Sequence, residues 1–219
     1  MYVGNTTVYF SIRRCYIHNI TGIEIDTQKG VAIETWVSNS GIGLFNVQNF
    51  ILENNIVSNT QWEGILMHRV MDGSVNNNTV SRARNAIRLS DSENVYVGNN
   101  EIENYIGINV SNSSNNNTVT KNSVTGLDNS RGVGIGLSSS NNYINNNTIS
   151  TYRYGIGADA EETNFIDDNI FLNIGDEEIF REYGEEQNGN DGDTPFLGFA
   201  FFTIAILVAG SIWKQRKRI

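Results

Sequence analysis

Residues 99–110 decide the fold, with the sequence Asn-Asn-Glu-Ile-Glu-Asn-Tyr-Ile-Gly-Ile-Asn-Val. They hold two short phrases, Asn100-Glu101-Ile102 and Gly107-Ile108-Asn109-Val110, and both recur along the chain in the same order. The first phrase returns at the asparagines Asn55, Asn78, Asn122, Asn147 and Asn169. The second returns at the small residues Gly22, Gly41, Gly64, Ala86, Gly134 and Gly155.

The asparagine phrases recur at a nearly constant spacing. Subtracting positions gives steps of 22 (78 to 100), 22 (100 to 122), 25 (122 to 147) and 22 (147 to 169). A period of this size indicates one supersecondary unit per repeat, stacked on its neighbours. The step of 25 places a longer corner at 125–133, and insertions on one side of a solenoid often build a binding surface.

Each repeat contains three short apolar runs, because a further phrase such as Val95-Tyr96-Val97 precedes the asparagine phrase. The runs alternate with period 2 and are rich in Ile, Val and Tyr, which favours strands. Three strands in about 22 residues leave no room for hairpins. They predict a triangular coil whose strands pair in parallel with the next coil, about 4.8 Å away. We therefore expect an all-β solenoid of seven to eight coils over 8–172.

Equivalent residues one coil apart should form columns. Asparagine suits such a column because its amide both donates and accepts hydrogen bonds, and because it tolerates the left-handed conformation at a tight corner. The small residue that heads each second phrase is expected to meet the same need at another corner. The predicted ladder consists of Asn55, Asn78, Asn100, Asn122, Asn147 and Asn169, and Cys15 occupies the same column in the first coil.

These phrases resemble the right-handed parallel β-helix superfamily, in particular its NosD-like branch and its carbohydrate-binding and sugar-hydrolysis branch. The resemblance covers residues 8–172 and is specific for architecture. It implies three classes of function, and the repeats alone do not choose among them. These are a scaffold that binds glycans or partner proteins, a polysaccharide lyase or glycoside hydrolase, and a NosD-like accessory to a copper enzyme.

Net charge and cysteine content exclude several classes of binding partner and site. The net charge of −9 argues against nucleic acid, which needs a basic surface, and the single cysteine excludes a disulfide framework. No His or Cys cluster has zinc-finger or CxxC spacing, so we expect neither a metal nor a cofactor.

The C-terminal region predicts a membrane anchor. The expected domains are the β-helix at 1–174, an acidic spacer at 175–195, a transmembrane helix at 196–213 and a basic tail at 214–219. The uncharged run would be about 27 Å long as a helix, and the basic residues after it place the C-terminus in the cytoplasm and the solenoid outside the cell. No signal peptide precedes the first repeat, so we expect the natural chain to begin upstream.

Two columns should face outward on the strand after each Gly corner. The first column holds Glu24, Gly43, Leu66, Arg88, Asn109, Gly136 and Gly157. The second holds Asp26, Phe45, His68, Ser90, Ser111, Ser138 and Asp159. In the related lyases and glycosidases the substrate lies along such a face. The binding candidates are Asp26, Phe45, His68 and Arg88, and the catalytic candidates are Glu24, His68 and Arg88, with His68 as a base.

Other candidates are weaker in pattern. Asp167-Asp168 resembles a glycosidase acid pair but aligns with corner residues, and His18 and His68 with Met67 and Met71 are the soft ligands for a copper role. Exposed aromatic residues that would stack on sugars are Tyr16, Trp36, Trp62, Tyr105, Tyr152 and Tyr154. Sequons for N-glycosylation occur at Asn5, Asn19, Asn77, Asn109, Asn112, Asn116 and Asn146.

Overall fold

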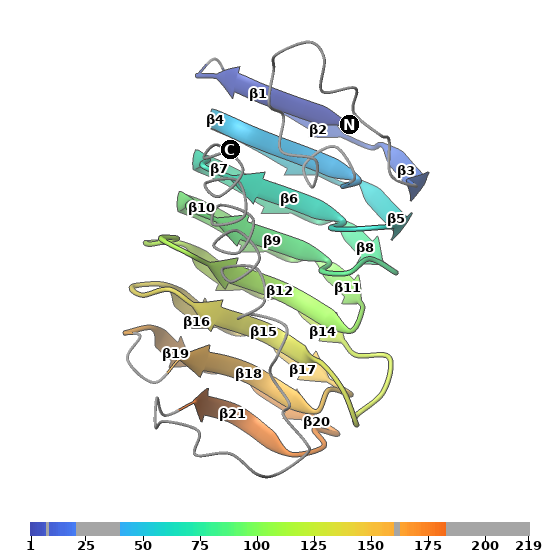
Figure 1. The fold of residues 1–219 in the computed structure, drawn as a ribbon, viewed down its shortest axis with the longest axis vertical. Coiled ribbons are helices and arrows are strands. Elements are labelled where there is room, and N and C mark those ends of the chain that lie inside the picture. Colours follow the sequence, from blue (N-terminus) through green and yellow to red (C-terminus); the bar gives the residue numbers. More distant parts are fainter. Residues whose placement is uncertain (8, 21–39, 160–162, 183–219) are drawn as a thin grey trace, which may run out of the picture. The chain divides into compact units, whose positions relative to one another are not determined.

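The structure is a computed structural model that describes residues 1–7, 9–20, 40–159 and 163–182. The chain divides into two units, Met1–Tyr183 and Gly184–Ile219, and all described residues belong to the first. That unit is a stack of triangular coils built from strands (Figure 1). Within the described ranges no helix has the length and hydropathy needed to cross a bilayer. The expected transmembrane helix at 196–213 lies outside the described residues.

Three sheets run along the solenoid, one for each side of the triangle, and the long strand β4 belongs to two of them (Figure 1). Sheet A holds β1 (Tyr2–Thr6), the first half of β4 (Ile42–Glu53), β6 (Ile65–His68), β9 (Ile87–Ser90), β12 (Ile106–Ser111), β15 (Val133–Ser138), β18 (Tyr154–Asp159) and β21 (Glu177–Glu182). Sheet B holds β2 (Phe10–Arg13), the second half of β4, β7 (Met71–Asn76), β10 (Glu93–Gly98), β13 (Thr118–Thr120), β16 (Tyr143–Asn145) and β19 (Phe165–Asp167). Sheet C holds β3 (Tyr16–Ile20), β5 (Ile56–Thr60), β8 (Thr79–Ser81), β11 (Glu101–Glu103), β14 (Ser123–Thr125), β17 (Thr148–Ser150) and β20 (Ile170–Leu172).

All strand pairs among the described residues are parallel, and the register confirms the predicted repeat. Ile108 pairs with Ile87 on one side and with Ile135 on the other, so equivalent isoleucines form one layer of the core. These side chains are fully buried, which stabilises each coil by about 1.5–3 kcal/mol per residue. The alternation of apolar and polar residues thus turns one face of each short strand into the core and the other outward.

The first described coil is a direct neighbour of the coil that contains β4. Tyr2 pairs with Gly43, and Tyr16 pairs with Ile56, a step of 40 residues (16 to 56) in place of one period. The repeat phrases expected at 22–37 lie outside the described residues. Sheet C has seven strands, so about six turns (seven strands, six steps) separate β3 from β20.

The asparagine column between sheets B and C is a continuous hydrogen-bonded ladder. The backbone N–H and the side-chain Nδ2 of Asn78 both donate to Oδ1 of Asn100, at 2.9 and 3.0 Å. Asn100 repeats this pattern with Asn122, and its Nδ2 also donates to the carbonyl of Val75. Cys15 begins the column, because its backbone N–H donates to Asn55 Oδ1. The ladder satisfies the buried polar groups of every turn at this corner.

Two conformational expectations for the corners are wrong. The left-handed residue is the one before each ladder asparagine, for example Asn99 (φ 53°) and Asp168 (φ 52°). Gly64 has no positive φ, and Gly132 is the one described glycine that does. Gly64 is instead required by close packing, since a Cβ there would lie 2.3 Å from Val80 Cγ1 and 2.7 Å from the carbonyl oxygen of Ala86.

Candidate functional site

The outward face of sheet A contains the two columns predicted from sequence. The register aligns Gly43, Leu66 and Arg88 in one column and Phe45, His68 and Ser90 in the next. Glu24 and Asp26 lie outside the described residues. The first column offers little surface, because Leu66 is 0% and Asn109 4% exposed. In the second column His68, Ser90 and Ser111 are also buried, whereas Phe45 is partly exposed. The accessible groups near Phe45 lie at the corner where sheet A turns into sheet B, where Arg69 is exposed and Asp91 is one-third exposed.

Phe45 is the aromatic centre of that corner. Its partly buried ring stacks on the His68 ring with centroids 5.2 Å apart and an interplanar angle of 19°. The exposed Arg69 guanidinium lies over Phe45, with Cζ 5.9 Å from the ring centroid. Arg69 adopts φ 54°, the left-handed conformation of the residue at this corner. Sequence analysis missed Arg69 because the repeat pattern does not show which residue occupies the left-handed corner.

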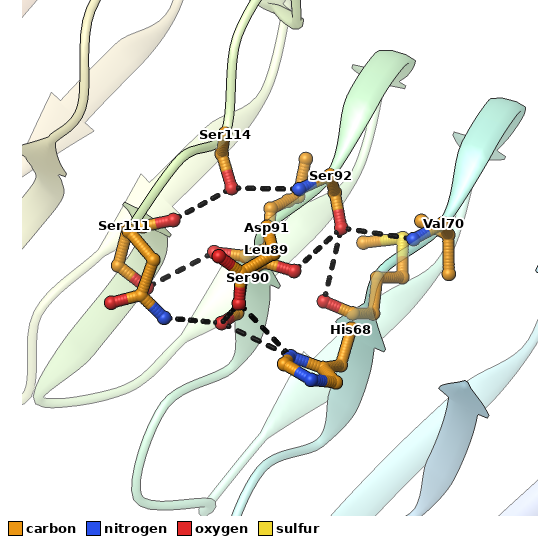
Figure 2. Close-up of polar contacts among 10 residues, drawn as sticks. His68, Val70, Leu89, Ser90, Asp91, Ser92, Ser111 and Ser114 are labelled. Carbon is orange, nitrogen blue, oxygen red and sulfur yellow. Dashed lines mark hydrogen bonds and ion pairs between the residues drawn. The ribbon is translucent and has the colours of Figure 1, made fainter. Parts of the chain in front are cut away.

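A polar network holds His68 in place beneath this surface. His68 Nδ1 lies 3.2 Å from Ser90 Oγ and 3.5 Å from Asp91 Oδ2, and the Ser90 hydroxyl donates to the same Asp91 oxygen (Figure 2). Asn112 Nδ2 donates to Ser90 Oγ at 2.6 Å. Asp91 is one-third exposed, and Asn112 is exposed. Together with Phe45 and Arg69 they form what we call the Phe45 corner.

The His68 network differs from a nucleophilic triad. In such a triad one ring nitrogen contacts the nucleophile and the other contacts the acid that orients the ring. Here Ser90 and Asp91 both face the same nitrogen, Nδ1, and His68 is only 5% exposed. This arrangement positions the ring beneath Phe45 and does not prepare Ser90 for attack.

Serine hydroxyls fasten the strand ends below the Phe45 corner. The backbone N–H of Val70 donates to Ser92 Oγ, and the backbone N–H of Ser92 donates to Ser114 Oγ (Figure 2). Ser92 also donates to the carbonyl of Ser90 at 2.9 Å, and Ser114 to that of Ser111 at 2.7 Å. The corner residues are therefore held by bonds to their own backbone and to the next coil.

Arg88 is engaged with a residue that sequence analysis did not single out. Arg88 Nη1 lies 3.5 Å from Glu63 Oε1, and Asn85 Nδ2 donates to the same oxygen at 3.2 Å. The Glu63 side chain is 2% exposed, so removing the arginine would leave a buried carboxylate without its cation. We predicted that Arg88 binds a sugar acid, but the same guanidinium already pairs with the buried Glu63 carboxylate.

The copper ligand set suggested by sequence is not assembled by the described residues. Met67 points into the core, while Met71 Sδ accepts a hydrogen bond from Gln48 Nε2 at 3.4 Å. The His18 side chain lies outside the described residues. No group of three or more His, Cys, Asp or Glu side chains suited to a metal occurs in the described ranges.

The predicted aromatic surface needs correction at two positions. Tyr152 is fully buried, because it fills the space under the long corner and donates to the carbonyl of Thr125 at 3.2 Å. Tyr154 is 6% exposed, and its ring packs against Phe180 with centroids 4.7 Å apart. Burial raises the pKa of the Tyr152 hydroxyl far above its usual value. Tyr16 and Tyr105 are exposed as predicted, and Trp62 is partly buried. Trp36 lies outside the described residues.

The sequons differ in accessibility. Asn109 is 4% exposed on sheet A, and Asn112 uses its amide to bind Ser90. The sequons at exposed corner positions with positive φ are Asn77, Asn112, Asn116 and Asn146. The side chains of Asn5 and Asn19 lie outside the described part of the chain. Modification at any of these sequons stays a prediction.

Comparison with known proteins agrees with the architecture. No curated protein and no solved structure matches the chain. One protein family, described as a right handed beta helix region, matches residues 2–135, which include the Phe45 corner and five of the ladder positions counted from Cys15 to Asn122. The chain therefore belongs to the right-handed β-helix family.

Proposed function

We propose that this chain is a cell-surface protein whose β-helix binds a glycan at the Phe45 corner without cleaving it. The observation that carries the proposal is the ring pair of Phe45 and His68, 5.2 Å apart, with the Arg69 guanidinium above Phe45. An aromatic ring fixed by packing offers a platform for the C–H face of a sugar, and it loses little entropy when the sugar binds.

Polar groups around the ring support a sugar ligand. Arg69 supplies donors, Asp91 supplies carboxylate oxygens, and the Asn112 side chain supplies an acceptor oxygen besides the Nδ2 that it uses on Ser90. Their bonds to the next coil orient these groups before a ligand arrives. A glycan presents hydroxyls that both donate and accept, so it matches this mixed set better than a purely apolar ligand would.

Binding without turnover is the form of the proposal that the side chains favour. His68 is nearly buried, with Ser90 and Asp91 both at Nδ1, and Arg88 is engaged with Glu63. A general base must reach the proton that it removes from the substrate. His68 is too deeply buried to serve as the predicted base, and Arg88 is paired with Glu63, so the proposal is binding without cleavage.

The experiment is a glycan array probed with the full chain, followed by titration of the strongest ligand. Phe45→Ala should weaken binding about tenfold, the equivalent of 1.4 kcal/mol for one stacking platform. Tyr143→Ala is the matched control, because Tyr143 is an exposed aromatic on sheet B and lies outside the Phe45 corner. Equal losses in the two variants, or no binding to any glycan, would remove the proposal.

Two further assays test the other two classes of function. Release of shortened products from a polysaccharide, abolished by His68→Ala, would establish a lyase or hydrolase in place of a binding protein. Copper titration of the full chain, monitored by absorbance, would support the NosD-like accessory role if it revealed a stoichiometric site.

The surface location rests on the sequence of the C-terminal region. The uncharged run at 196–213 and the basic residues at 214–218 support a single span with the solenoid outside the cell. A tag beside Gly4 should be degraded by protease added to intact cells, while a cytosolic marker survives. Survival of the tag alongside the cytosolic marker would reverse the orientation.

A further inference from the structure

The two ends of the described stack carry opposite charge. The first coil contains β1, β2 and β3, and the last contains β19, β20 and β21 (Figure 1). In residues 1–20 the Lys, Arg, Asp and Glu residues are two arginines, Arg13 and Arg14. Residues 163–182 hold six acidic residues and one arginine, namely Asp167, Asp168, Asp176, Glu177, Glu178, Glu182 and Arg181. The two ends are therefore electrostatically complementary to each other.

Both ends also present strand edges. Among the described residues β2 pairs with β4 and β3 with β5, each on one side, and β19 and β20 pair in the same one-sided way with β16 and β17. Such an edge is a template for pairing with another chain. The core is less covered here, because Ile166 and Phe171 are only partly buried, whereas Ile144 and Ile149 in the preceding coil are fully buried.

The strand register shows which residues would meet if the stack continued into a second copy. One outward column of sheet B runs through Arg13, Glu53, Asn76, Gly98, Thr120, Asn145 and Asp167. The left-handed corner that follows it begins with Arg14 (φ 55°) and ends with Asp168 (φ 52°). A second copy placed one coil step of about 4.8 Å beyond β19 brings its Arg13 and Arg14 beside Asp167 and Asp168.

An ion pair within the stack shows that this column spacing suits opposite charges. Arg13 Nε lies 3.1 Å from Glu53 Oε2, and the two residues are cross-strand partners one coil apart. Arg14, Asp167 and Asp168 are exposed and form no ion pair with another described residue. Arg14 and Asp168 are therefore the charges best placed to pair across a junction between copies.

We infer that copies of this chain associate end to end, with the first coil of one copy stacked on the last coil of another. Sheets B and C continue in parallel across the junction, Ile12 and Ile17 cover Ile166 and Phe171, and Arg14 pairs with Asp168. The two contacting surfaces differ, so the contact is heterologous and leaves one free end of each kind. It therefore builds open filaments and not closed dimers.

The asparagine ladder limits how tightly the copies hold each other. Within the stack, Asn147 donates its backbone N–H and its Nδ2 to Asn169 Oδ1 at 3.0 and 2.9 Å. Across the junction Asn169 meets Cys15, which has no amide oxygen to accept the same two bonds. Cys15→Asn supplies that oxygen and should tighten association about three- to tenfold, whereas Cys15→Ala should not. Equal effects of the two substitutions would contradict this alignment.

The main test is sedimentation velocity of the solubilised full chain over a range of concentrations at low salt. Arg14→Asp and Asp168→Lys should each weaken association about three- to tenfold, because each places like charges at the junction. Both introduce residue types that the same left-handed corner already holds, at Asp168 and Lys121. Lys121→Asp is the matched control, because it makes the same change of charge as Arg14→Asp in the middle of the stack. It should associate like the wild type.

Mixing the two variants separates the junction from any effect on folding. Arg14→Asp alone places two carboxylates at the junction, and Asp168→Lys alone places two cations there. In an equimolar mixture the variants alternate, every junction holds opposite charges, and wild-type association should return. Sedimentation of the wild type that does not depend on concentration, an equal loss in Lys121→Asp, or no recovery on mixing would each overturn the inference. Phe45→Ala should associate like the wild type, so this inference and the glycan proposal can fail independently.

Discussion

The asparagine ladder and the corner between sheets C and A belong to the same coils, but only the ladder repeats one residue. The second corner, which we call the edge, holds in five successive coils Trp62, Arg84, Tyr105, Arg131 and Arg153. At the ladder, six coils place the same amide in the same geometry, as in the bonds from Asn78 to Asn100 and from Asn100 to Asn122. At the edge, five coils differ in the residue at the corner and in the length of the turn, which is longest at 126–132. The ladder satisfies buried backbone groups and tolerates little change, whereas the edge is solvent-facing and free to vary. The corner between sheets B and C holds the stack together, and so does the second asparagine column between sheets A and B, in which Asn117 donates to Asn142. The corner between sheets C and A instead varies from coil to coil.

The largest expected difference between the two corners is the effect of alanine on stability. Asn100→Ala removes the acceptor for both Asn78 donors and the donor to Val75 O and Asn122 Oδ1, so buried polar groups in three coils lose partners. We expect a loss of about 3 kcal/mol in the free energy of unfolding, measured with urea. Tyr105→Ala at the edge should cost below about 1 kcal/mol. Similar losses would mean that the ladder is not the stabilising corner.

The packing of corner glycines gives the next largest effect. Gly64→Ala places a methyl group against Val80 and the Ala86 carbonyl, and we expect about 2 kcal/mol of destabilisation. Gly98→Ala is the control, because the three atoms nearest to its methyl group would all belong to the Tyr96 side chain, which can rotate, and none to the backbone. Thermal unfolding of the two variants compares a fixed backbone neighbour with a movable side chain. A larger loss for Gly98→Ala would reverse this assignment.

A smaller effect is expected under the inserted loop. Tyr152→Phe removes the hydroxyl that donates to the Thr125 carbonyl, while the ring continues to fill the space below residues 126–132. The expected cost is about 1 kcal/mol. Tyr143→Phe, which changes a half-exposed ring on sheet B, should leave urea unfolding unchanged. If the two variants are equally stable, the Tyr152 hydroxyl contributes nothing to the loop.

The smallest effect concerns pH in the same loop. Hydrogen bonds from the Ser130 hydroxyl and N–H lower the pKa of the exposed Asp128 carboxyl below 3.8, with a further contribution from Arg131. Because the folded-state pKa is the lower one, the contribution of Asp128 is present above pH 3.8 and is lost as the pH falls through the folded-state pKa. An NMR titration of the Asp128 carboxyl should show a depressed midpoint that moves back toward 3.8 in Ser130→Ala. An unchanged midpoint in that variant would assign the shift to another group.

The sequence predicted the aromatic part of the Phe45 corner but not its charged residues. The repeat phase placed Phe45 and His68 in one outward column, and the register has them there. It did not reveal Arg69 or Asp91, which reach the site from left-handed corner positions (φ 54° and 52°). Glu63 also escaped notice, because a single acidic residue before a glycine has no periodic signal. A second asparagine column, Asn117 with Asn142, could have been found, since each precedes the third apolar phrase of its coil.

The sequence by itself determined the parallel coil, its layers and its asparagine ladder, because these depend on local period and on residues that repeat in phase. An isoleucine every coil must enter the same layer once the strands pair in parallel, as Ile108 and Ile135 do. Only the tertiary structure decided which residues bend the corners, why Gly64 must lack a side chain, and that Tyr152 lies under the inserted loop. It also decided that Arg88 faces Glu63 and that five unlike corners form one edge. These features depend on atoms from neighbouring coils that approach one another within a few ångströms, and the period of a sequence carries no record of such contacts.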